Sequence, residues 1–338
     1  MKILQCTIPG KFEYKNADYP QLLEGTAIIR IRRIGICGTD LHAFQGSQPF
    51  FDYPRILGHE LAGDVVEYNG DGDFKPGDIV TIIPYFNCGK CIACRSGKTN
   101  CCAKLKVSGV HIDGGMTEYL RVPAYSLVHN GGLSYDELAL VEPLSIGAHG
   151  VRRTQVKAGE FILVVGAGPI GLGCMEFARI QGGKVIALDV NEQRLDFCQK
   201  SLGVDYIINA RSNDVFEQLE KITNGDMPTV IMDATGNLTA INNAFRFLAH
   251  GGRYILVGLQ KGDISFSHPE FHKREATLMS SRNATRADFE YVMDCMRKGL
   301  IKPETYITHR THFDRIKSQF ESWLDPANGT IKAIVEVD

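Results

Sequence analysis

Residues 161–171 read Phe161-Ile-Leu-Val-Val-Gly166-Ala-Gly168-Pro169-Ile170-Gly171, an apolar run that ends in three spaced glycines. The run predicts a buried strand, and the pattern that follows predicts a helix. In such a strand–turn–helix unit the glycines allow a tight turn, a close approach of a pyrophosphate to the backbone, and close packing of the helix on the strand. An ordinary glycine turn is the alternative, and the flanking sequence decides between them.

A second strand supplies a carboxylate at the expected place. It reads Lys184-Val-Ile-Ala-Leu-Asp189, and Asp189 lies near the spacing of the acidic residue that binds the adenosine ribose hydroxyls in dinucleotide-binding proteins. A carboxylate there would repel a 2'-phosphate, so NAD is favoured over NADP. The candidate nucleotide-binding residues are Gly166, Gly168, Pro169, Ile170, Gly171, Asp189, Arg194, Thr235 and Val257.

Strand and helix patterns alternate up to residue 284. Six strands with intervening helices predict a doubly wound parallel sheet, which we place at residues 148–284. Beyond the two strands above, the predicted elements are strands at 206–208, 229–233, 253–257 and 276–280, and helices at 191–202, 215–223 and 238–248.

The two ends of the chain follow other patterns. Residues 1–147 hold short apolar runs separated by Gly, Pro and Asp, which predict a small barrel-like β domain. In the tail, apolar residues at helical spacing predict helices from Asp288 to about Gly299 and over 316–324, and a last strand over 331–337. We expect residues 285–338 to fold back on residues 1–147, so that the nucleotide-binding domain is an insertion.

The bulk composition excludes several classes of function. The 338 residues are 44% hydrophobic and 22% charged, with a net charge of -2. Without a basic excess, we expect no binding to nucleic acid. We also expect no membrane span and no signal peptide, and hence a cytoplasmic protein.

Four of the ten cysteines are clustered. Cys88-Gly-Lys-Cys91-Ile-Ala-Cys94 is followed by Cys102, in a lobe spanning about residues 86–103. Four thiolates at this spacing predict a closed, tetrahedral structural zinc site. A chance cluster of free thiols is the alternative. The neighbouring Cys101 leaves the fourth ligand open, and we favour Cys102.

A second metal site is suggested by two short segments. They read Cys37-Gly-Thr39-Asp40-Leu-His42 and Gly58-His59-Glu60. A thiolate, an imidazole and a carboxylate make a three-ligand zinc site with one position open, which a catalytic zinc needs in order to act on a substrate oxygen. The alternative is that Cys37 and His59 are packing residues of the core.

Together with Val141-Glu142-Pro143 and the glycine-rich turn, these segments resemble the zinc-dependent medium-chain dehydrogenase/reductase family. The resemblance covers essentially the whole chain and implies a GroES-like β-barrel catalytic domain plus a Rossmann domain. Glu142, at a position where primary alcohol dehydrogenases usually carry cysteine, resembles the polyol (sorbitol-type) branch. Residues 46–58, 267–273 and 281–285 are similar to bacterial L-galactonate and L-gulonate 5-dehydrogenases and to the starvation-sensing proteins grouped with them.

The resemblance implies two zinc ions per chain, NAD, and a role for each residue of the catalytic metal site around Cys37 and His59. Cys37, His59 and Glu60 would bind the catalytic zinc, and Glu142 would either bind it or hold its water. Asp40 would fix the imidazole of His59. Thr39 and His42 would relay the substrate proton to solvent, although His42 could also be an ordinary surface histidine.

The substrate is the least determined part of this reading. The resemblance suggests Arg282, Asn283, Phe50, Phe51 and His111 as candidate substrate contacts, with ordinary packing as the alternative. The leading function is NAD-dependent oxidation of a secondary hydroxyl of a sugar acid, of the L-galactonate or L-gulonate type at C5. A neutral polyol dehydrogenase and a non-catalytic NAD-binding sensor are the alternatives, and the complete relay argues against the sensor. The resemblance also implies a homodimer or homotetramer.

Overall fold

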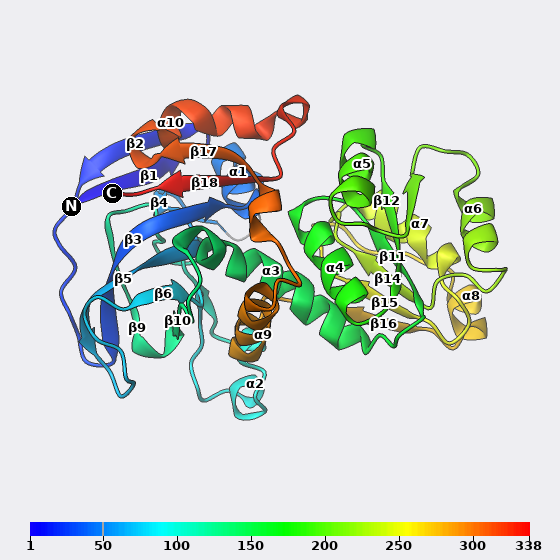
Figure 1. Ribbon diagram of the computed structural model, residues 1–338, viewed down its shortest axis with the longest axis horizontal. Helices are drawn as coiled ribbons and strands as arrows, with labels where there is room; N and C mark the ends of the chain where they lie inside the picture. Colours follow the sequence, from blue (N-terminus) through cyan, green and yellow to red (C-terminus); the bar gives the residue numbers. More distant parts are fainter. Residues whose placement is uncertain (49–50) are drawn as a thin grey trace. The chain divides into compact units, whose positions relative to one another are not determined.

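A computed structural model describes residues 1–48 and 51–338 and divides them into two compact units (Figure 1). The first unit contains Met1–Pro143 and Ala284–Asp338, and the second contains Leu144–Asn283. The sequence predicts boundaries at 147/148 and 284/285. Both the predicted and the observed first boundary fall inside helix α3 (Tyr135–Thr154), and the observed one follows Pro143, which lies within this helix.

The first unit is built mainly from β-strands. Its large sheet has the strand order β10-β6-β5-β3-β18-β17, with β9 paired to β3, and a smaller sheet has the order β2-β1-β4. The strands of the large sheet are β3 (Thr26–Ile36), β5 (Glu60–Asn69), β6 (Ile79–Ile82), β9 (Tyr119–Pro123), β10 (Leu127–His129), β17 (Ile307–His312) and β18 (Lys332–Glu336). Those of the small sheet are β1 (Lys2–Ile8), β2 (Lys11–Asn16) and β4 (Arg55–Ile56).

The C-terminal tail completes the large sheet. Strand β18 pairs antiparallel with β3, with Ala333 opposite Ile36, and the red and blue strands lie side by side in Figure 1. Because side chains alternate across a strand, Ala333 and Val335 enter the hydrophobic core while Lys332 points to the other face.

The helices that lie wholly within the first unit are short, except for α9. They are α1 (Gly38–Gln45), α2 (Ile92–Arg95), α9 (Arg286–Arg297) and α10 (Ile316–Gln319). The helix predicted over 316–324 was too long, because α10 gives way to a 3-10 segment, Phe320–Leu324. That segment still buries Phe320 and Trp323 in the core, which explains the apolar pattern.

The second unit is a six-stranded parallel sheet with the order β13-β12-β11-β14-β15-β16. This is the strand order of a Rossmann fold. Helices α4 and α5 lie on one side of the sheet, and α7 and α8 on the other (Figure 1). The strands are β11 (Phe161–Val165), β12 (Lys184–Asp189), β13 (Tyr206–Asn209), β14 (Val230–Asp233), β15 (Arg253–Leu256) and β16 (Thr277–Ser280).

The helices of the second unit largely follow the predicted pattern. They are α4 (Pro169–Ile180), α5 (Glu192–Lys200), α6 (Val215–Ile222), α7 (Leu238–Ala244) and α8 (His268–Lys273). The helix predicted over 238–248 ends earlier, because a 3-10 turn, Phe245–Phe247, follows α7. The predicted β domain and the predicted six-stranded Rossmann sheet are confirmed. Within the described residues no helix is long and apolar enough to cross a membrane.

Candidate active site and metal centres

One buried carboxylate, that of Asp40, joins the two segments of the candidate catalytic metal site. Cys37 is the N-cap of α1, and Asp40 is the third residue of that helix. Asp40 Oδ2 accepts a hydrogen bond from the Cys37 backbone N–H at 2.9 Å, and Oδ1 accepts one from Gly58 N–H at 3.1 Å. Because Gly58 directly precedes His59, Asp40 fixes the backbone beside both candidate ligands.

Three of the predicted ligands converge. One donor atom from each of Cys37, His59 and Glu60 lies within 4.8 Å of the others. Burial disfavours a charged imidazole, but the nearby Asp40 and Cys37 raise the pKa of His59 well above its usual value. Surroundings that attract a positive charge, together with sulfur, nitrogen and oxygen donors, fit a zinc ion.

Asp40 also lies beside the ring of His59. Its Oδ1 is 3.6 Å from His59 Nδ1, a buried ring nitrogen that has no hydrogen-bond partner among the described residues. A carboxylate beside the second nitrogen of a ligating histidine orients the ring and raises its basicity. This is the role that the sequence predicts for Asp40.

Glu60 has a second partner that the sequence analysis missed. Lys332 Nζ lies 2.6 and 2.7 Å from the two carboxylate oxygens of Glu60, and both side chains are buried. Burial lowers the pKa of Lys332, but the Glu60 carboxylate outweighs it and the net shift is upward. The pair fits because Gly35 faces Glu60 across the strands: a Cβ at Gly35 would lie 2.1 Å from Glu60 Oε2.

Glu142 is held differently. It lies outside the three-residue group above, and its Oε1 accepts a hydrogen bond from the hydroxyl of Tyr85 on strand β7 (Tyr85–Phe86). Burial, with Glu60 nearby, raises the pKa of Glu142 to about 7. Burial and the adjacent Glu142 raise the pKa of Tyr85 well above its usual value, so the phenol keeps its proton and remains a donor.

A weak signal for Lys332 was present in the sequence. A lysine between Ile331 and Ala333 in an apolar strand is unusual, because lysine is rarely buried without a partner. The chain holds 39 acidic residues, however, and only the fold selects Glu60. Tyr85 carried no such signal.

The relay candidates lie on α1. Thr39 is half-buried, and His42 is exposed with its Nδ1 3.2 Å from Ser47 Oγ. Exposure suits a group that exchanges protons with solvent.

The candidate pocket residues of the first unit have mixed outcomes. Phe50 lies outside the described residues. Phe51 packs against the hydrophobic core and contacts the Tyr53 ring edge-on. Nδ1 of His111 accepts the Val107 backbone N–H at 3.1 Å, so this ring helps to shape its own loop.

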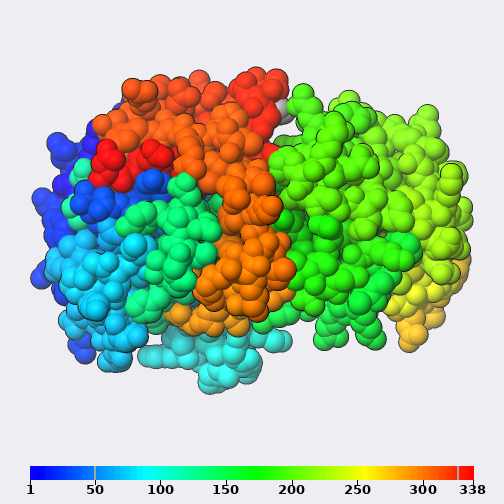
Figure 2. Space-filling view, in the orientation of Figure 1, coloured from blue at the N-terminus to red at the C-terminus, as the bar shows by residue number. Residues whose placement is uncertain are grey.

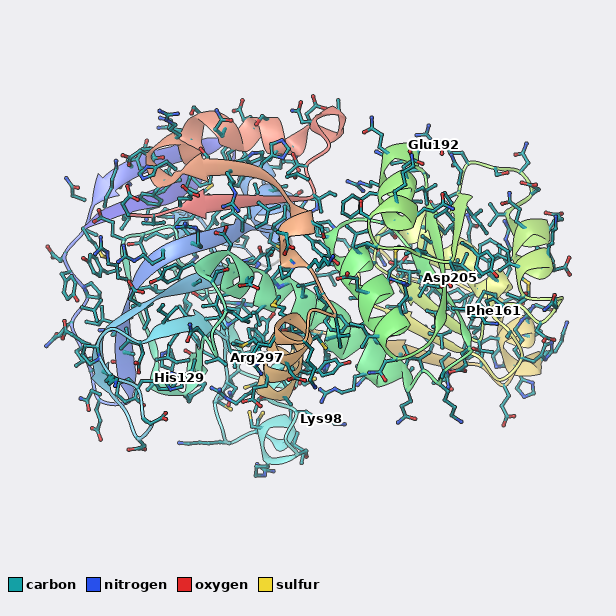
Figure 3. The ribbon with its side chains drawn as sticks, in the orientation of Figure 1. Lys98, His129, Phe161, Glu192, Asp205 and Arg297 are labelled. Carbon is teal, nitrogen blue, oxygen red and sulfur yellow. The ribbon has the colours of Figure 1, made fainter. Side chains whose placement is uncertain are left out.

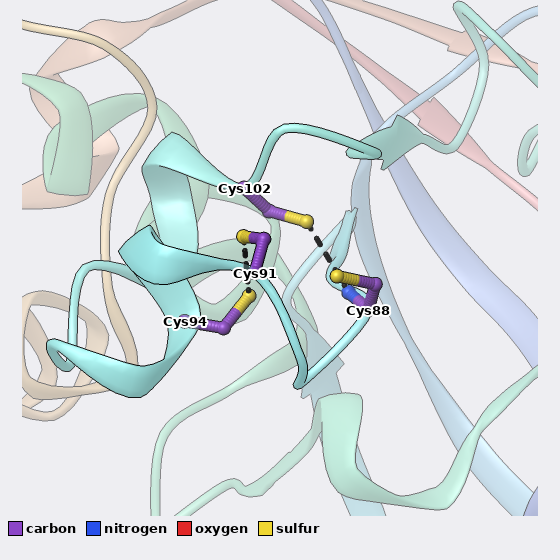
Figure 4. Close-up of side chains that lie close together, drawn as sticks. All are labelled: Cys88, Cys91, Cys94 and Cys102. Carbon is purple, nitrogen blue, oxygen red and sulfur yellow. Dashed lines mark hydrogen bonds between the residues drawn. The ribbon is translucent and has the colours of Figure 1, made fainter.

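The four clustered cysteines face one another. Donor atoms of Cys88, Cys91, Cys94 and Cys102 all lie within 4.8 Å, and Cys91 Sγ is 3.5 Å from Cys94 Sγ (Figure 4). Cys101 is exposed and does not belong to this group. The lobe, coloured cyan, projects at the bottom of the space-filling view (Figure 2). Four sulfur donors without an open position fit a structural zinc.

The glycine-rich turn of the second unit shows why its glycines differ. Gly166 has a φ of +100°, and a Cβ at Gly171 would lie 1.8 Å from Gly166 O, so the turn and its packing require both. A Cβ at Gly168 would meet nothing within 4 Å. Gly168 is the N-cap of α4, where the helix presents free N–H groups. The space above Gly168 therefore fits a phosphate group at a helix N-terminus.

Asp189 ends strand β12 beside this turn. Its Oδ2 accepts the Ala167 backbone N–H at 2.6 Å, and its Oδ1 accepts the Asn191 N–H at 2.8 Å. Each carboxylate oxygen keeps a further lone pair, as ribose hydroxyl donors would need. Arg194 is half-buried on α5, whose first residue Glu192 is labelled in Figure 3.

A second loop of the same sheet is organised by Asp233, which the sequence analysis did not select. Its carboxylate accepts hydrogen bonds from Thr235 Oγ1 at 2.8 Å and from the backbone N–H of Thr235 and Gly236 at 3.1 Å each. The Asp233 carbonyl accepts the Val257 N–H at 2.8 Å. The predicted residues Thr235 and Val257 thus lie on loops joined at the carboxyl end of β14.

The remaining candidate substrate-binding residues, Arg282 and Asn283, are the last two residues of the second unit. Arg282 is exposed, and Asn283 has a φ of +53°. Asparagine tolerates this left-handed conformation better than most residues. A backbone reason therefore exists for Asn283, independent of any substrate.

Comparisons with known proteins agree with this geometry. Residues 23–131 match the alcohol dehydrogenase GroES-like domain, and residues 169–298 match the zinc-binding dehydrogenase domain. The chain is 41% identical to an L-galactonate-5-dehydrogenase of Escherichia coli K12 over 99% of this chain and 98% of that protein. It is 31% identical to a sorbitol dehydrogenase of Halalkalibacterium halodurans, over 91% and 92% of the two chains. The structure of an Escherichia coli CFT073 alcohol dehydrogenase complexed with NADH superposes with a TM-score of 0.93 at 28% identity, covering 99% of both chains.

Proposed function

The chain belongs to the family of zinc-binding alcohol dehydrogenases with a GroES-like domain, and on that premise we propose that it oxidises a secondary hydroxyl of a sugar acid with NAD. The observation that carries the proposal is the convergence of Cys37, His59 and Glu60 in one unit. The glycine-rich turn with Asp189 in the other unit supports the cofactor. The likeness to an L-galactonate-5-dehydrogenase supports the substrate class.

The residues of the chain have distinct tasks in this reaction. When bound, a zinc ion supplies a Lewis acid for the substrate oxygen, and NAD supplies the hydride acceptor. Cys37 and His59 hold the metal, with Glu60 or Glu142 as the oxygen donor, and Asp40 orients His59. The Thr39 hydroxyl takes the substrate proton, and the exposed His42 passes it to solvent. Gly168 leaves room for the pyrophosphate, Gly166 and Gly171 allow the turn beside it, and Asp189 holds the adenosine ribose.

The cofactor assignment predicts the effect of one isosteric substitution. Asp189→Asn should lower the ratio of kcat/KM with NAD to kcat/KM with NADP by at least about tenfold, because the amide no longer repels a 2'-phosphate. The asparagine oxygen can still accept the Ala167 N–H, whereas the amide NH2, a donor, loses the hydrogen bond from the Asn191 N–H. Steady-state kinetics with both cofactors measure the ratio.

Asp205→Asn is the matched control. Asp205 Oδ2 also accepts a backbone N–H, that of Val185 at 2.9 Å, and it is exposed in the same unit (Figure 3). It should leave the cofactor ratio unchanged. An unchanged ratio in Asp189→Asn as well would count against the ribose assignment.

The relay predicts a pH-dependent defect. His42→Ala should slow turnover most at low pH, where solvent offers fewer bases to accept the proton, and should leave the zinc content unchanged. Rates across pH with and without added imidazole, together with metal analysis, provide the measurement. Ser47→Ala, which removes the neighbouring hydroxyl but keeps the imidazole, is the control. Loss of zinc in His42→Ala would contradict the relay role.

The substrate class is tested with matched panels of C6 aldonates and neutral hexitols. We expect NADH formation to be fastest with L-galactonate or L-gulonate. Arg282 is proposed to bind the substrate carboxylate, since its planar guanidinium matches a carboxylate in two parallel hydrogen bonds. Arg282→Ala should then raise KM for aldonates more than for hexitols. An equal rise in KM on both panels would show that Arg282 does not bind the carboxylate, and unchanged KM and kcat would remove it from the site.

A neutral polyol substrate is the second candidate. The likeness to a sorbitol dehydrogenase favours it. Faster oxidation of sorbitol or galactitol than of any aldonate would select this alternative and leave the zinc and NAD assignments standing.

The proposal includes a homodimer or homotetramer. Strand β16 is an edge strand of the second sheet, with Leu278 37% exposed. An exposed edge strand can pair with another chain. Light scattering after size-exclusion chromatography gives the number of subunits.

A further inference from the structure

Tyr85 and Glu142 form a buried pair for which the reaction above gives no role to the tyrosine. Tyr85 is 5% exposed and Glu142 is 4% exposed. The Tyr85 hydroxyl donates a hydrogen bond to Glu142 Oε1. Hydrogen bonds in which the acceptor is a charged carboxylate are about twice as strong as those between neutral groups.

The two carboxylates near the candidate catalytic metal are held in different ways. Glu60 is bound through both oxygens by the cation of Lys332. Among the described residues, Glu142 receives a hydrogen bond from a neutral hydroxyl, on one oxygen. A lysine balances the charge of its partner, whereas a hydroxyl orients its partner and brings no opposite charge. The pair with Tyr85 therefore restrains Glu142 without making it a poorer partner for a metal or a metal-bound water.

Tyr85 is itself fixed from two sides. Its backbone pairs with Val107 of strand β8 (Lys106–Val107), and its ring contacts Phe289 edge-on with centroids 6.3 Å apart. Strands β7 and β8 immediately precede and follow the four-cysteine lobe. The lobe and the Phe289 ring thus hold the hydroxyl in place.

We propose that Tyr85 is a positioning residue of the catalytic metal site, and that its hydroxyl keeps Glu142 in one orientation toward the group formed by Cys37, His59 and Glu60. The inference rests on the proposed function, because it requires a metal at that group. Loss of a residue that hydrogen-bonds to a metal ligand typically lowers metal affinity or activity about 10–100-fold.

The test removes only the hydroxyl. In protein carrying Co²⁺ at the catalytic site and zinc at the four cysteines, Tyr85→Phe should release Co²⁺ to dipicolinate about 10-fold or more faster than the unaltered protein. Its visible Co²⁺ absorption bands should also shift. The control is Tyr254→Phe on β15. It removes another buried tyrosine hydroxyl, which donates a hydrogen bond to Ile241 O at 3.1 Å. It should match the unaltered protein in both measurements.

A double-mutant cycle shows whether Tyr85 acts through Glu142. In a Glu142→Ala background, Tyr85→Phe should change the Co²⁺ release rate by less than about twofold, because the partner is gone. An equal acceleration in both backgrounds would overturn the proposal. So would a Tyr85→Phe variant that behaves like Tyr254→Phe.

A further variant guards against misfolding. If Tyr85→Phe does not fold, two variants of Glu142 replace it. Glu142→Gln keeps an oxygen for the Tyr85 hydroxyl and should therefore shift the Co²⁺ bands less than Glu142→Ala. Equal shifts would overturn the proposal. If the unaltered protein holds no metal beyond the four-cysteine zinc, the proposed function and the inference about Tyr85 both fail. If it holds both metals and only the Tyr85 results fail, the proposed function stands.

Discussion

His59→Ala is expected to lower kcat/KM for alcohol oxidation about a thousand-fold or more and to remove one of two zinc ions per chain. A Lewis-acid metal contributes several kcal/mol to stabilising the transition state, and each 1.36 kcal/mol is about a factor of ten in rate. His59 does not belong to the four-cysteine site, so that site should keep its zinc. Metal analysis and steady-state kinetics on the same preparation measure both effects.

His129→Ala is the control for this variant. His129 is an exposed histidine of the same unit, labelled in Figure 3, with its Nε2 3.2 Å from Asp73 Oδ1. It should retain both zinc ions and nearly full activity. If His59→Ala also kept two zinc ions, the assignment of His59 as a ligand would be wrong.

Lys332→Met is expected to destabilise the first unit by about 3–5 kcal/mol, because it leaves the buried Glu60 without its counter-charge. Urea unfolding can be followed by the fluorescence of Trp323. It is the single tryptophan of the chain and lies in the core of the unit that contains Lys332. Adding Glu60→Gln to Lys332→Met should recover part of the loss, since the unpaired charge is removed.

Lys298→Met makes the same substitution at an exposed ion pair of the same unit. Lys298 Nζ lies 2.6 Å from Asp294 Oδ2 on α9, and both side chains face solvent. Exposed pairs of this kind contribute little to stability, because water and salt screen the two charges. A loss in Lys332→Met no larger than that in Lys298→Met would show that the buried pair does not stabilise the fold.

Together the two variants distinguish a residue that binds the metal from a residue that holds a metal ligand in place. His59→Ala removes a donor and should leave the fold nearly intact. Lys332→Met leaves the three donors present but frees Glu60. His59→Ala should therefore lower the zinc content with little change in the free energy of unfolding. Lys332→Met should mainly lower the free energy of unfolding.

Local patterns in the sequence were enough for the sheet of the second unit and the donor sets. The alternation of strands and helices after Phe161 predicts a parallel sheet because each element carries its own periodicity. The spacing of Cys88, Cys91 and Cys94 predicts a zinc lobe because ligands so close along the chain can turn back on one ion. Element ends were less predictable: at Phe245 and Phe320 the helical pattern continues in 3-10 geometry, and the burial of the apolar residues is unchanged.

Partnerships between distant residues were decided only by the tertiary structure. Lys332 meets Glu60 across 272 positions, and Tyr85 meets Glu142 across 57. Each pair joins elements that are far apart in the sequence. Lys332 on β18 reaches Glu60 on β5 because both strands pair with β3, and Tyr85 on β7 meets Glu142 on α3. The sequence by itself thus determined which chemical groups are available for zinc and NAD. The tertiary structure decided which buried charges are neutralised and which remain to act on a metal, since a charge removed from water is stabilised only by the partners that the fold places beside it.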